Sequence, residues 1–513
     1  MATPAETKTV AFRTIGCKLN QCETAQMQET LLADGYRLVD WDSAADIRVV
    51  NTCTVTAKSD RTCRHEIRLA KRLDPGCAVV VTGCYAQTAP DAVAAIPGVD
   101  LVLGNLDKLR LAEHLAGIGP AIAGAPETTE ERAGEAAPGA GSPAAPAGVA
   151  GTEPRHPALS VSPYPEHPEF EGEFFSHFYG YTRAFLKVQT GCDSYCAYCI
   201  IPIARGPARS MPKADVLREV GLLAERGFRE VVLTGINLGS WGRDTGEGSI
   251  ADLLDALLSR DTGGAPDVVG RYRLSSIEPL EVDGALMASI EAAGDRVARH
   301  FHLPLQSGSD SVLRRMSRPY TAAGYLAIAT ELAARFPDAA IGADVIVGFP
   351  GETEAEFAET LAFVEHAPLT YLHVFSYSDR PGTKASQMGS KVPPDTVHDR
   401  SVALRALGER KNVGFRDRLR GTAQRVLVLK ERDAAGRLVG ITGNYVEALL
   451  DGDDALMNRF ATVRLEEPGE DGRWTATLLE AEPDAGNAEA GPGAAGPRGA
   501  ADSRPAPGGA GGC

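Results

Sequence analysis

Short apolar stretches alternate with amphipathic stretches of helical period through residues 8–116. KTVAFRTIGC, IRVVNTC and CAVVVTGC have the composition of strands, and ETAQMQETLLADGY predicts a helix that ends at Gly35. A basic stretch of helical period lies between the second and third of these strands. Strands that alternate with helices favour a parallel sheet. We therefore predict a parallel α/β domain over residues 1–117.

The same alternation returns over residues 178–411. Six apolar segments are typical of strands there: AFLKVQT, EVVLTG, YRLSSI, HFHLPL, AIGADVIVGF and TYLHVFSYS. Amphipathic helices are expected between most of them. Six such units predict a partial (β/α)6 barrel, which holds its site at the C-terminal ends of the strands.

Beyond residue 412 the pattern changes to short strands with Gly and Asp turns and no long helix. RVLVLKE, LVGITGNYVEALL, FATVRLEE and RWTATLLEAE predict a small β-barrel over residues 412–482. Residues 118–177 and 483–513 are rich in Ala, Gly and Pro, and the first of these stretches is acidic. Neither stretch can bury enough apolar area to order itself, so we expect a flexible linker and a disordered tail.

Length and charge narrow the possibilities further. A chain of 513 residues is long enough for several domains. No apolar run approaches the ~18 residues of a membrane span, and the N-terminus has no secretory signal pattern. We therefore expect a cytoplasmic protein without a membrane partner. The net charge is −16, yet residues 403–430 carry eight basic and two acidic side chains. Local patches decide what a surface binds, so the acidic total does not exclude RNA.

Three of the ten cysteines lie in one short loop after a predicted strand. Cys192, Cys196 and Cys199 have the spacing C-x3-C-x2-C. Thiolates are the usual ligands of iron–sulfur clusters, and three of them leave one iron able to bind S-adenosylmethionine, a source of radicals. A zinc knuckle is the alternative, but structural zinc normally takes four protein ligands and no fourth Cys or His lies nearby. The loop favours a radical enzyme.

Three further cysteines each follow a predicted strand of the N-terminal domain. Cys17, Cys53 and Cys84 come just after the first, second and third strands. Parallel sheets bring their C-terminal strand ends to one edge, so these residues are predicted to converge. The alternative is three structural cysteines buried in a core.

The Cys192 loop resembles the radical S-adenosylmethionine superfamily. Together with GCKLN (16–20), NTC (51–53), TGC (82–84) and the C-terminal module, the chain is similar to the methylthiotransferases. That family has an N-terminal cluster domain, a radical barrel and a C-terminal TRAM domain. GCKLNQCETAQM, NTCTVTAKSDR, TGCYAQT and CIIPIARG look most like the branch that modifies N6-threonylcarbamoyladenosine at position 37 of tRNA.

Other functions stay open at this point. The related branches act on isopentenyl-adenosine 37 of tRNA or on a ribosomal protein. A basic C-terminal module favours RNA over a protein target. A non-enzymatic electron-transfer or scaffold protein is a third possibility, but electron transfer alone does not require a barrel of this size.

The resemblance implies two [4Fe-4S] clusters, one on Cys192, Cys196 and Cys199 and an auxiliary one on Cys17, Cys53 and Cys84. It also implies S-adenosylmethionine, whose cleavage to a 5′-deoxyadenosyl radical removes hydrogen from C2 of adenine, and sulfur supplied at the auxiliary cluster. An electron donor such as flavodoxin or ferredoxin is expected, and a monomer is assumed. No catalytic acid or base is assigned beyond the cluster ligands.

Polar groups near the later strand ends are candidates for binding the cofactor or substrate. Together with Tyr198 in the cysteine loop they are Asn237, Ser276, Glu278, Gln306 and Asp344. Asn, Ser and Asp are equally common in caps and turns, which is the alternative for each.

Two basic stretches are candidates for binding RNA. The helix KSDRTCRHEIRLAKR (58–72) contains Lys58, Arg61, Arg64 and Arg68, and ERKNVGFRDRLRGTAQR (409–425) contains Arg410, Lys411, Arg416, Arg418 and Arg420. Neutralised phosphates would supply much of the affinity, although a solvated charged face is the alternative for either stretch. Carbon 2 of an adenine is reached only when the base is unstacked, which favours a single-stranded anticodon loop.

Overall fold

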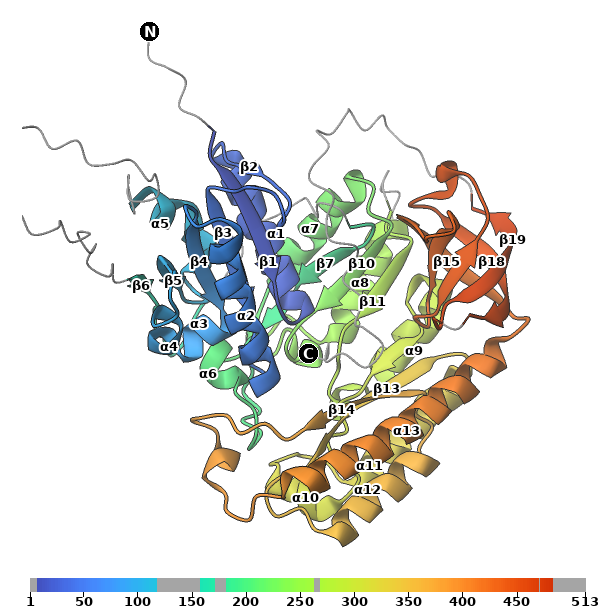
Figure 1. Ribbon diagram of the computed structural model, residues 1–513. Coiled ribbons are helices and arrows are strands. Elements are labelled where there is room, and N and C mark those ends of the chain that lie inside the picture. Colours follow the sequence, from blue (N-terminus) through green and yellow to red (C-terminus); the bar gives the residue numbers. More distant parts are fainter. Residues whose placement is uncertain (1–6, 118–156, 171–180, 263–267, 470, 483–513) are drawn as a thin grey trace, which may run out of the picture.

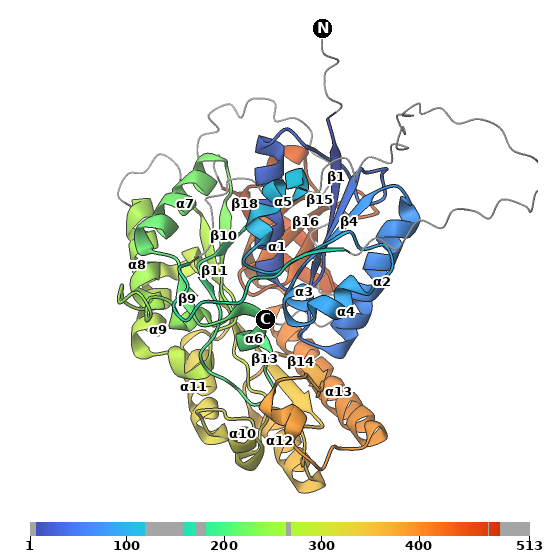
Figure 2. The ribbon, with the colours of Figure 1, turned by 90° about the vertical axis from the view of Figure 1, so that its left-hand side faces the viewer.

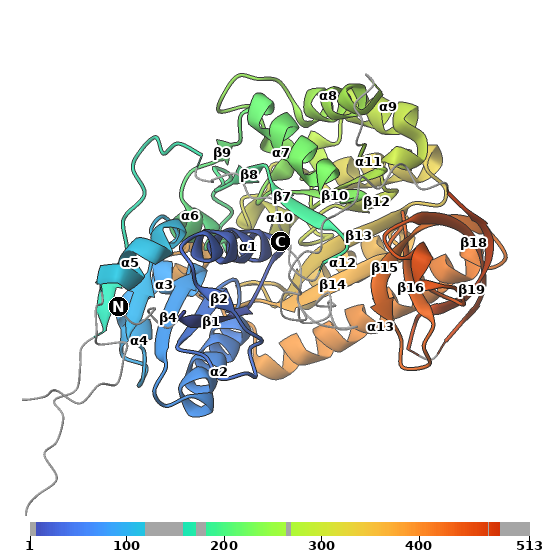
Figure 3. The same cartoon turned by 90° about the horizontal axis from the view of Figure 1, so that it is seen from above.

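The computed structural model describes residues 7–117, 157–170, 181–262, 268–469 and 471–482. An N-terminal domain and a C-terminal β-barrel lie on opposite sides of a central core (Figures 1 and 3). The mixed α/β architecture expected from the hydrophobic pattern is confirmed. In the described ranges, no helix combines the length and the apolar character that crossing a membrane requires.

The N-terminal domain is a parallel sheet with the order β2-β1-β3-β4-β5-β6. Its strands are β1 (Thr9–Thr14), β2 (Arg37–Leu38), β3 (Ile47–Thr52), β4 (Ala78–Gly83), β5 (Leu101–Leu103) and β6 (Ala158–Ser160), and its helices are α1 (Lys18–Ala33), α2 (Ala57–Leu73), α3 (Cys84–Thr88), α4 (Pro90–Ala94) and α5 (Leu111–Gly117). Every residue of β3 and β4 is buried, as expected of parallel strands covered on both faces.

Strand β6 corrects one expectation. It lies inside the stretch 118–177 that we predicted to be a flexible linker, but it pairs in parallel with β5 as the sixth strand of the sheet. Just after it, the main chain and hydroxyl of Ser162 both donate to Asp107, each at 2.8 Å. These hydrogen bonds hold the segment together with the packing of Val161 on the core of the domain, and such long-range contacts leave no trace in composition. Residues 118–156 and 171–177 of the expected linker, and 483–513 of the expected tail, lie outside the described residues.

The core contains the six expected strands as two parallel three-stranded sheets, β11-β10-β7 and β12-β13-β14. They are β7 (Ala184–Lys187), β10 (Glu230–Thr234), β11 (Arg271–Leu274), β12 (His300–His302), β13 (Ala340–Val347) and β14 (Tyr371–Ser376); the short β8 (Gln189–Thr190) and β9 (Arg209–Ser210) pair with each other. The accompanying helices are α6 (Ile201–Arg205), α7 (Lys213–Glu225), α8 (Ile250–Thr262), α9 (Gly284–Ala293), α10 (Asp310–Arg315), α11 (Ala322–Arg335), α12 (Glu354–His366) and α13 (Pro394–Leu419).

This barrel is not closed, because among the described strands β7 does not pair with β14, and β11 does not pair with β12. Helix α1 of the N-terminal domain packs against β7, and the thiol of Cys22 lies 3.1 Å from the carbonyl oxygen of Phe185. Cys22 therefore belongs to the hydrophobic core of the barrel, although it is part of the N-terminal domain in sequence. Figure 2 shows the molecule from the side of the N-terminal domain, with α1 near the middle of the view.

The C-terminal module is a closed five-stranded barrel with the order β15-β16-β17-β19-β18. Its strands are β15 (Ala423–Arg432), β16 (Leu438–Thr442), β17 (Glu447–Leu450), β18 (Phe460–Pro468) and β19 (Trp474–Ala481). We expected a domain boundary at residue 412 and no long helix beyond it. Helix α13 instead continues across that boundary to Leu419, so its last turns belong to the C-terminal module. Phe415 and Leu419 on its last turns are part of the apolar core of the module, and burying them favours a longer helix.

Candidate active site: two cysteine triads

Cys192, Cys196 and Cys199 lie in the loop that follows β7 and β8. Gly191, with a φ of +69°, begins the loop, and a Cβ there would lie 1.8 Å from the carbonyl oxygen of Pro207. Only glycine permits this close approach. The loop is then held by main-chain hydrogen bonds, from Cys192 to Gly206 at 3.1 Å and from Cys199 to the carbonyl of Cys196 at 3.0 Å. The sequence thus fixes a compact loop that presents three thiols.

These three thiols interact with one another. Burial, together with the charges of the neighbouring Cys196 and Cys192, raises the pKa of Cys199 to about 12, and burial also raises the pKa of Cys192. All three are free cysteines. The guanidinium of Arg318, which is only 8% exposed, donates to Cys196 Sγ at 3.2 Å and pairs with Glu278. A buried cation beside the triad is suited to compensating the negative charge of thiolate ligands.

Cys17, Cys53 and Cys84 converge at the C-terminal edge of the N-terminal sheet, as the strand pattern predicted. They follow β1, β3 and β4, and Cys17 caps α1 while Cys84 begins α3. Two glycines let the loops crowd together. A Cβ on Gly16 (φ +108°) would lie 2.6 Å from Cys53 Cβ, and one on Gly83 (φ +95°) would lie 2.4 Å from the carbonyl oxygen of Thr52.

This second triad is also buried and electrostatically coupled. Burial raises the pKa of Cys17 and of Cys53; the charge of Cys84 adds to the rise in both, and the charge of Cys17 adds to the rise in Cys53. Arg205, 2% exposed, lies close enough to Cys84 and Cys17 for their negative charge to raise its own pKa, although burial opposes this. Thiols with raised pKa values and a cation beside them fit a metal cluster, whose binding deprotonates its ligands.

A buried ionic network joins the two triads. Arg205 ends α6, just after the first triad, and binds Glu23 of α1 through both oxygens at 2.8 and 3.0 Å. Lys108 Nζ lies 2.5 Å from the same carboxylate, and Asn105 donates to the carbonyl of Ala204 at 2.7 Å. Three cations, including Lys187 at 3.6 Å, hold the pKa of Glu23 well below its usual range against the effect of burial.

The sulfur atoms of neither triad are as close together as the ligands of a single metal ion. Across the described ranges, His302, Asp344 and His373 form the one group of three or more His, Cys, Asp or Glu residues whose ligand atoms all lie within 4.8 Å of one another. Sulfurs that share one zinc, at about 2.3 Å each, would lie within that distance. In neither triad do all three sulfurs lie within that distance of one another.

The remaining candidates for the cofactor site separate into two groups. Tyr198, Glu278 and Asn237 lie on the side of the first triad. Burial raises the pKa of Tyr198 well above its usual value, with Arg318 and two of the cysteines nearby. Glu278 reaches Cys196 through Arg318, and Asn237, whose main chain donates to Gln189 at 2.9 Å, has a buried Oδ1 without a hydrogen-bond partner.

Asp344 lies on β13, and Gln306 lies beside it in the segment that follows β12. The Gln306 main chain donates to the Asp344 carbonyl at 2.7 Å, and Gln306 has a φ of +68°. The Asp344 carboxylate contacts His302 and His373. Ser276 is partly exposed between β11 and Glu278, and it makes no hydrogen bond that would assign it a role.

The predicted RNA contacts fall on two helices. On α2, Lys58, Arg61 and Arg68 are exposed, whereas Arg64 donates to Tyr85 at 3.1 Å. On α13, Arg410 and Arg418 are exposed. The other three bind protein groups: Lys411 donates to the carbonyls of Glu365 and Ala367, Arg416 to that of Gly472, and Arg420 pairs with Glu467. Both helices lie at the lower edge of Figure 3, on the same side of the molecule.

The sequence reasoning missed several residues around the triads. Arg318 and Arg205 had no signal beyond being basic in otherwise apolar surroundings. Cys63 lies next to Cys53, accepting its main-chain N–H at 3.4 Å. His302 and His373 belong to predicted strands, where alternation with apolar neighbours would place them inside the barrel. Tyr371 reaches His302 across Gly342, where a Cβ would lie 1.9 Å from its ring.

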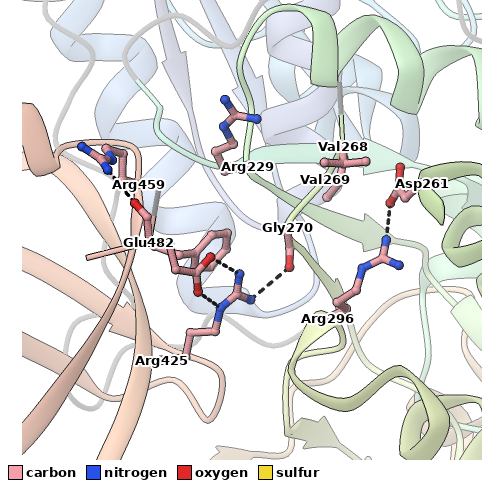
Figure 4. A pocket seen from close by; sticks show the side chains of 10 residues that line it. Arg229, Asp261, Val268, Val269, Gly270, Arg296, Arg425, Arg459 and Glu482 are labelled. Atoms are coloured by element: carbon pink, nitrogen blue, oxygen red, sulfur yellow. Dashed lines mark hydrogen bonds and ion pairs between the residues drawn. The ribbon is translucent and has the colours of Figure 1, made fainter. Parts of the chain in front are cut away.

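An arginine-lined pocket of about 320 Å³ lies elsewhere, between the core and the β-barrel (Figure 4). Arg229 and Gly270, which line it, directly precede β10 and β11, so it opens at the N-terminal edge of the barrel. The cysteine loop is at the opposite edge. Arg425 in this pocket pairs with Glu482 and Arg296 with Asp261. We therefore do not assign the chemistry to this pocket.

An open α/β barrel with a three-cysteine loop after its first strand defines a radical S-adenosylmethionine enzyme. Residues 186–364 match the model of the radical SAM superfamily, and residues 9–104 match that of uncharacterized protein family UPF0004. The radical S-adenosylmethionine methyltransferase TsrM from Kitasatospora setae has a similar fold, with a TM-score of 0.52 and 16% identity over 74% of this chain and 77% of that one.

Similarity to proteins of known name extends over nearly the whole chain. It is 34% identical to the threonylcarbamoyladenosine tRNA methylthiotransferase MtaB of Bacillus subtilis, over 90% of this chain and 94% of that protein. It is 37% identical to the MtaB of Aquifex aeolicus, over 86% and 97%. A tRNA-2-methylthio-N(6)-dimethylallyladenosine synthase of Acidothermus cellulolyticus is 35% identical over 79% and 74%. The chain belongs to the methylthiotransferase family of radical S-adenosylmethionine enzymes.

Proposed function

We propose that this enzyme adds a methylthio group to C2 of N6-threonylcarbamoyladenosine at position 37 of tRNA. The observation that carries the proposal is the pair of three-cysteine sites in one molecule, joined by the Arg205–Glu23 network. One site accounts for radical formation and the other for a sulfur group. The names of the MtaB relatives from Bacillus and Aquifex supply the nucleoside.

Both triads have the donor chemistry for a [4Fe-4S] cluster. Cys192, Cys196 and Cys199 would hold the cluster of the radical core, which the family implies together with S-adenosylmethionine. Cys17, Cys53 and Cys84 would hold the auxiliary cluster. When bound, these groups supply the electron that cleaves S-adenosylmethionine and the sulfur that is transferred.

The protein groups around the triads position and shield these ligands. Arg318 contacts both Cys196 and Glu278, and so links Glu278 to the first triad. We propose that Glu278 orients the cofactor together with Tyr198 and Asn237. The free Oδ1 of Asn237 is suited to accept a hydrogen bond from the cofactor. Ser276, Gln306 and Asp344 are proposed as further contacts to cofactor or substrate.

The exposed cations of α2 and α13 are proposed to contact the tRNA backbone. Lys58, Arg61 and Arg68 follow Cys53 in sequence, so phosphates bound there would lie beside the auxiliary triad. Arg410 and Arg418 would extend the surface toward the β-barrel, which we interpret as a TRAM domain. The buried or paired Arg64, Lys411, Arg416 and Arg420 would contribute less, because their donors are already used.

The cellular location, the oligomeric state, the electron donor and the domain boundaries belong to the same proposal. We infer a cytoplasmic monomer that receives electrons from a flavodoxin or ferredoxin and binds the anticodon loop. The proposed division of the chain is 1–117, 178–411 and 412–482, with α13 shared between the last two parts. The contrary possibility of an isopentenyl-adenosine substrate has support in the dimethylallyladenosine synthases among the relatives.

The proposal is tested by mass spectrometry of tRNA nucleosides from a strain that lacks the gene. We expect loss of the 2-methylthio form of threonylcarbamoyladenosine and its return when the gene is restored. Loss of the 2-methylthio form of dimethylallyladenosine instead would assign the other branch. Unchanged tRNA would contradict a tRNA substrate altogether.

A further inference from the structure

Lys18 comes directly after Cys17, yet its ammonium group has no ionic partner. Within the ranges that the structure describes, Lys18 makes no hydrogen bond through its side chain and no ion pair with a carboxylate. Its ammonium group lies over the ring of Tyr445 in the β-barrel, with the ring centroid 6.0 Å from Nζ. The residue is half-buried. A partly buried charge without a counterion is costly, so this group is suited to an anionic ligand.

The surroundings of this ammonium are themselves cationic. Arg273 and Arg183 also lie over the ring of Tyr445, with their guanidinium carbons 4.4 and 5.6 Å from its centroid. Both arginines and Arg271 share a single carboxylate, that of Glu230. Although burial alone would raise it, these cations lower the pKa of Tyr445 to about 8. Lys18, Arg183, Arg271 and Arg273 thus gather around Tyr445 and Glu230, and the field of these cations attracts anions.

A row of polar side chains leads away from this cationic cluster along the inside of the barrel. His300 packs on the same tyrosine, with ring centroids 4.7 Å apart. Tyr371 Oη lies 2.8 Å from His300 Nε2 and 3.1 Å from His302 Nδ1. Asp344 Oδ1 then lies 3.0 Å from His302 Nε2 and 3.2 Å from His373 Nδ1. The row thus ends at an acceptor, Asp344, in the predicted substrate site.

We propose that Lys18 binds the carboxylate of an amino-acid substituent on the target adenine and thereby selects that nucleoside. This inference rests on the proposed function and explains its choice of substrate. A threonylcarbamoyl group carries N–H donors near the base and a carboxylate at its far end. The carboxylate matches the ammonium group of Lys18 and the cations beside it. A dimethylallyl group has no polar atoms and would leave these partners unsatisfied, which sites of this kind reject strongly.

The phosphate backbone of the same tRNA is a second source of an anion for Lys18. The two sources differ in one respect: phosphates are present in every tRNA, whereas the carboxylate is present only in the threonylcarbamoylated form. Binding of one tRNA sequence with three different nucleosides at position 37 therefore separates them. The three are threonylcarbamoyladenosine, unmodified adenosine and dimethylallyladenosine.

The experiment compares reconstituted wild-type enzyme with the Lys18→Met and Lys18→Arg variants and with Lys8→Met as a matched control. Lys8 is an exposed lysine of the same domain. Affinity for each tRNA and the yield of methylthio nucleoside are measured. We expect Lys18→Met to weaken binding of the threonylcarbamoylated tRNA about 10- to 100-fold, the range for a lost charge-assisted hydrogen bond. Binding of the unmodified tRNA should change less than about twofold in the same variant.

The conservative and control variants keep the result interpretable. Lys18→Arg should recover most of the affinity, and Lys8→Met should match the wild type; iron content and thermal unfolding report whether each variant folds. Equal weakening for all three tRNAs would assign Lys18 to a phosphate and overturn the inference, as would no weakening at all. If the wild-type enzyme itself prefers the dimethylallyl tRNA, the proposed function fails before any variant is considered.

Discussion

The two cysteine triads reach similar environments by different routes. Cys192, Cys196 and Cys199 lie within eight residues of one loop, which main-chain hydrogen bonds such as that from Cys192 to Gly206 hold in place. Cys17, Cys53 and Cys84 come from three separate strand ends, and they meet only because the parallel sheet aligns those ends. Both sets are free thiols next to a buried arginine.

The difference shows what each site requires of the fold. The first triad depends on local geometry, in which Gly191 allows contact with Pro207. The second depends on long-range packing, in which Gly16 and Gly83 let neighbouring loops touch. The second triad should therefore be more sensitive to changes in the sheet. The Arg205–Glu23 network makes the two sites parts of one rigid unit.

The largest expected effect is on the local triad. Replacing Cys192, Cys196 and Cys199 by Ala should lower the iron content of reconstituted enzyme from about eight to about four per chain. It should also abolish cleavage of S-adenosylmethionine, because the cluster proposed to bind and reduce it is lost while only the auxiliary cluster remains. Iron analysis and chromatography of 5′-deoxyadenosine measure both. Cleavage at the wild-type rate would refute the assignment. Cys77→Ala, a buried cysteine in the core of the N-terminal domain, is the control.

The matching replacement of Cys17, Cys53 and Cys84 should separate the two sites. Iron should again fall to about four per chain, but S-adenosylmethionine cleavage should persist while no methylthio nucleoside forms. The reason is that radical formation uses the other loop. Mass spectrometry of the tRNA product decides the matter, and any methylthio product from this variant would exclude an auxiliary cluster on these residues. Cys63→Ser tests whether the neighbour of Cys53 is needed for the cluster.

Arg205→Met should be the next largest change, since it removes the link between the sites. The substitution leaves the buried Glu23 with two of its three cations, and breaking such a network typically costs about 3–5 kcal/mol. Chemical denaturation measures the loss. In a double-mutant cycle with Glu23→Gln, the second substitution should cost much less in the Arg205→Met background. Additive effects would mean that the pair does not couple the domains.

The smallest expected effect is a pH dependence of stability, which should differ between two buried carboxylates, Glu281 and Glu23. Burial raises the pKa of Glu281, near Glu278, to about 7, and Arg243 only partly offsets this. Because the folded pKa lies above the unfolded value of 4.5, its contribution to stability is present at low pH and is lost as pH rises to about 7. Glu23, with its lowered pKa, has the opposite dependence and keeps its contribution at neutral pH.

We therefore expect Glu281→Gln to be more stable than the wild type at pH 8 and not at pH 5. The difference between the two pH values should be about 2 kcal/mol, allowing for partial relaxation of the site. Thermal unfolding at both pH values measures it. The same stability difference at pH 5 and pH 8 would show that Glu281 does not titrate in this range.

Much of the architecture could be predicted because it depends on repeating local patterns. Continuous apolar runs such as residues 78–81 predicted buried parallel strands, and both triads could be located from their spacing or their place after strands. The presence of β6 as a strand of the sheet could not be predicted. Its pairing with β5 rests on main-chain hydrogen bonds, which leave little trace in composition. The end of α13 was also missed, because Phe415 and Leu419 are buried by a module that follows them.

The sequence alone determined the six cysteines in two sets of three, which we propose as the ligands of two iron–sulfur clusters. It also determined the strand ends on which the second set lies. Only the tertiary structure decided which charges accompany them. Arg318 reaches Cys196 from 122 residues away, Arg205 reaches Glu23 from 182, and Lys18 reaches Tyr445 in the β-barrel. Such pairs form where packing brings distant segments together, and no local pattern encodes that.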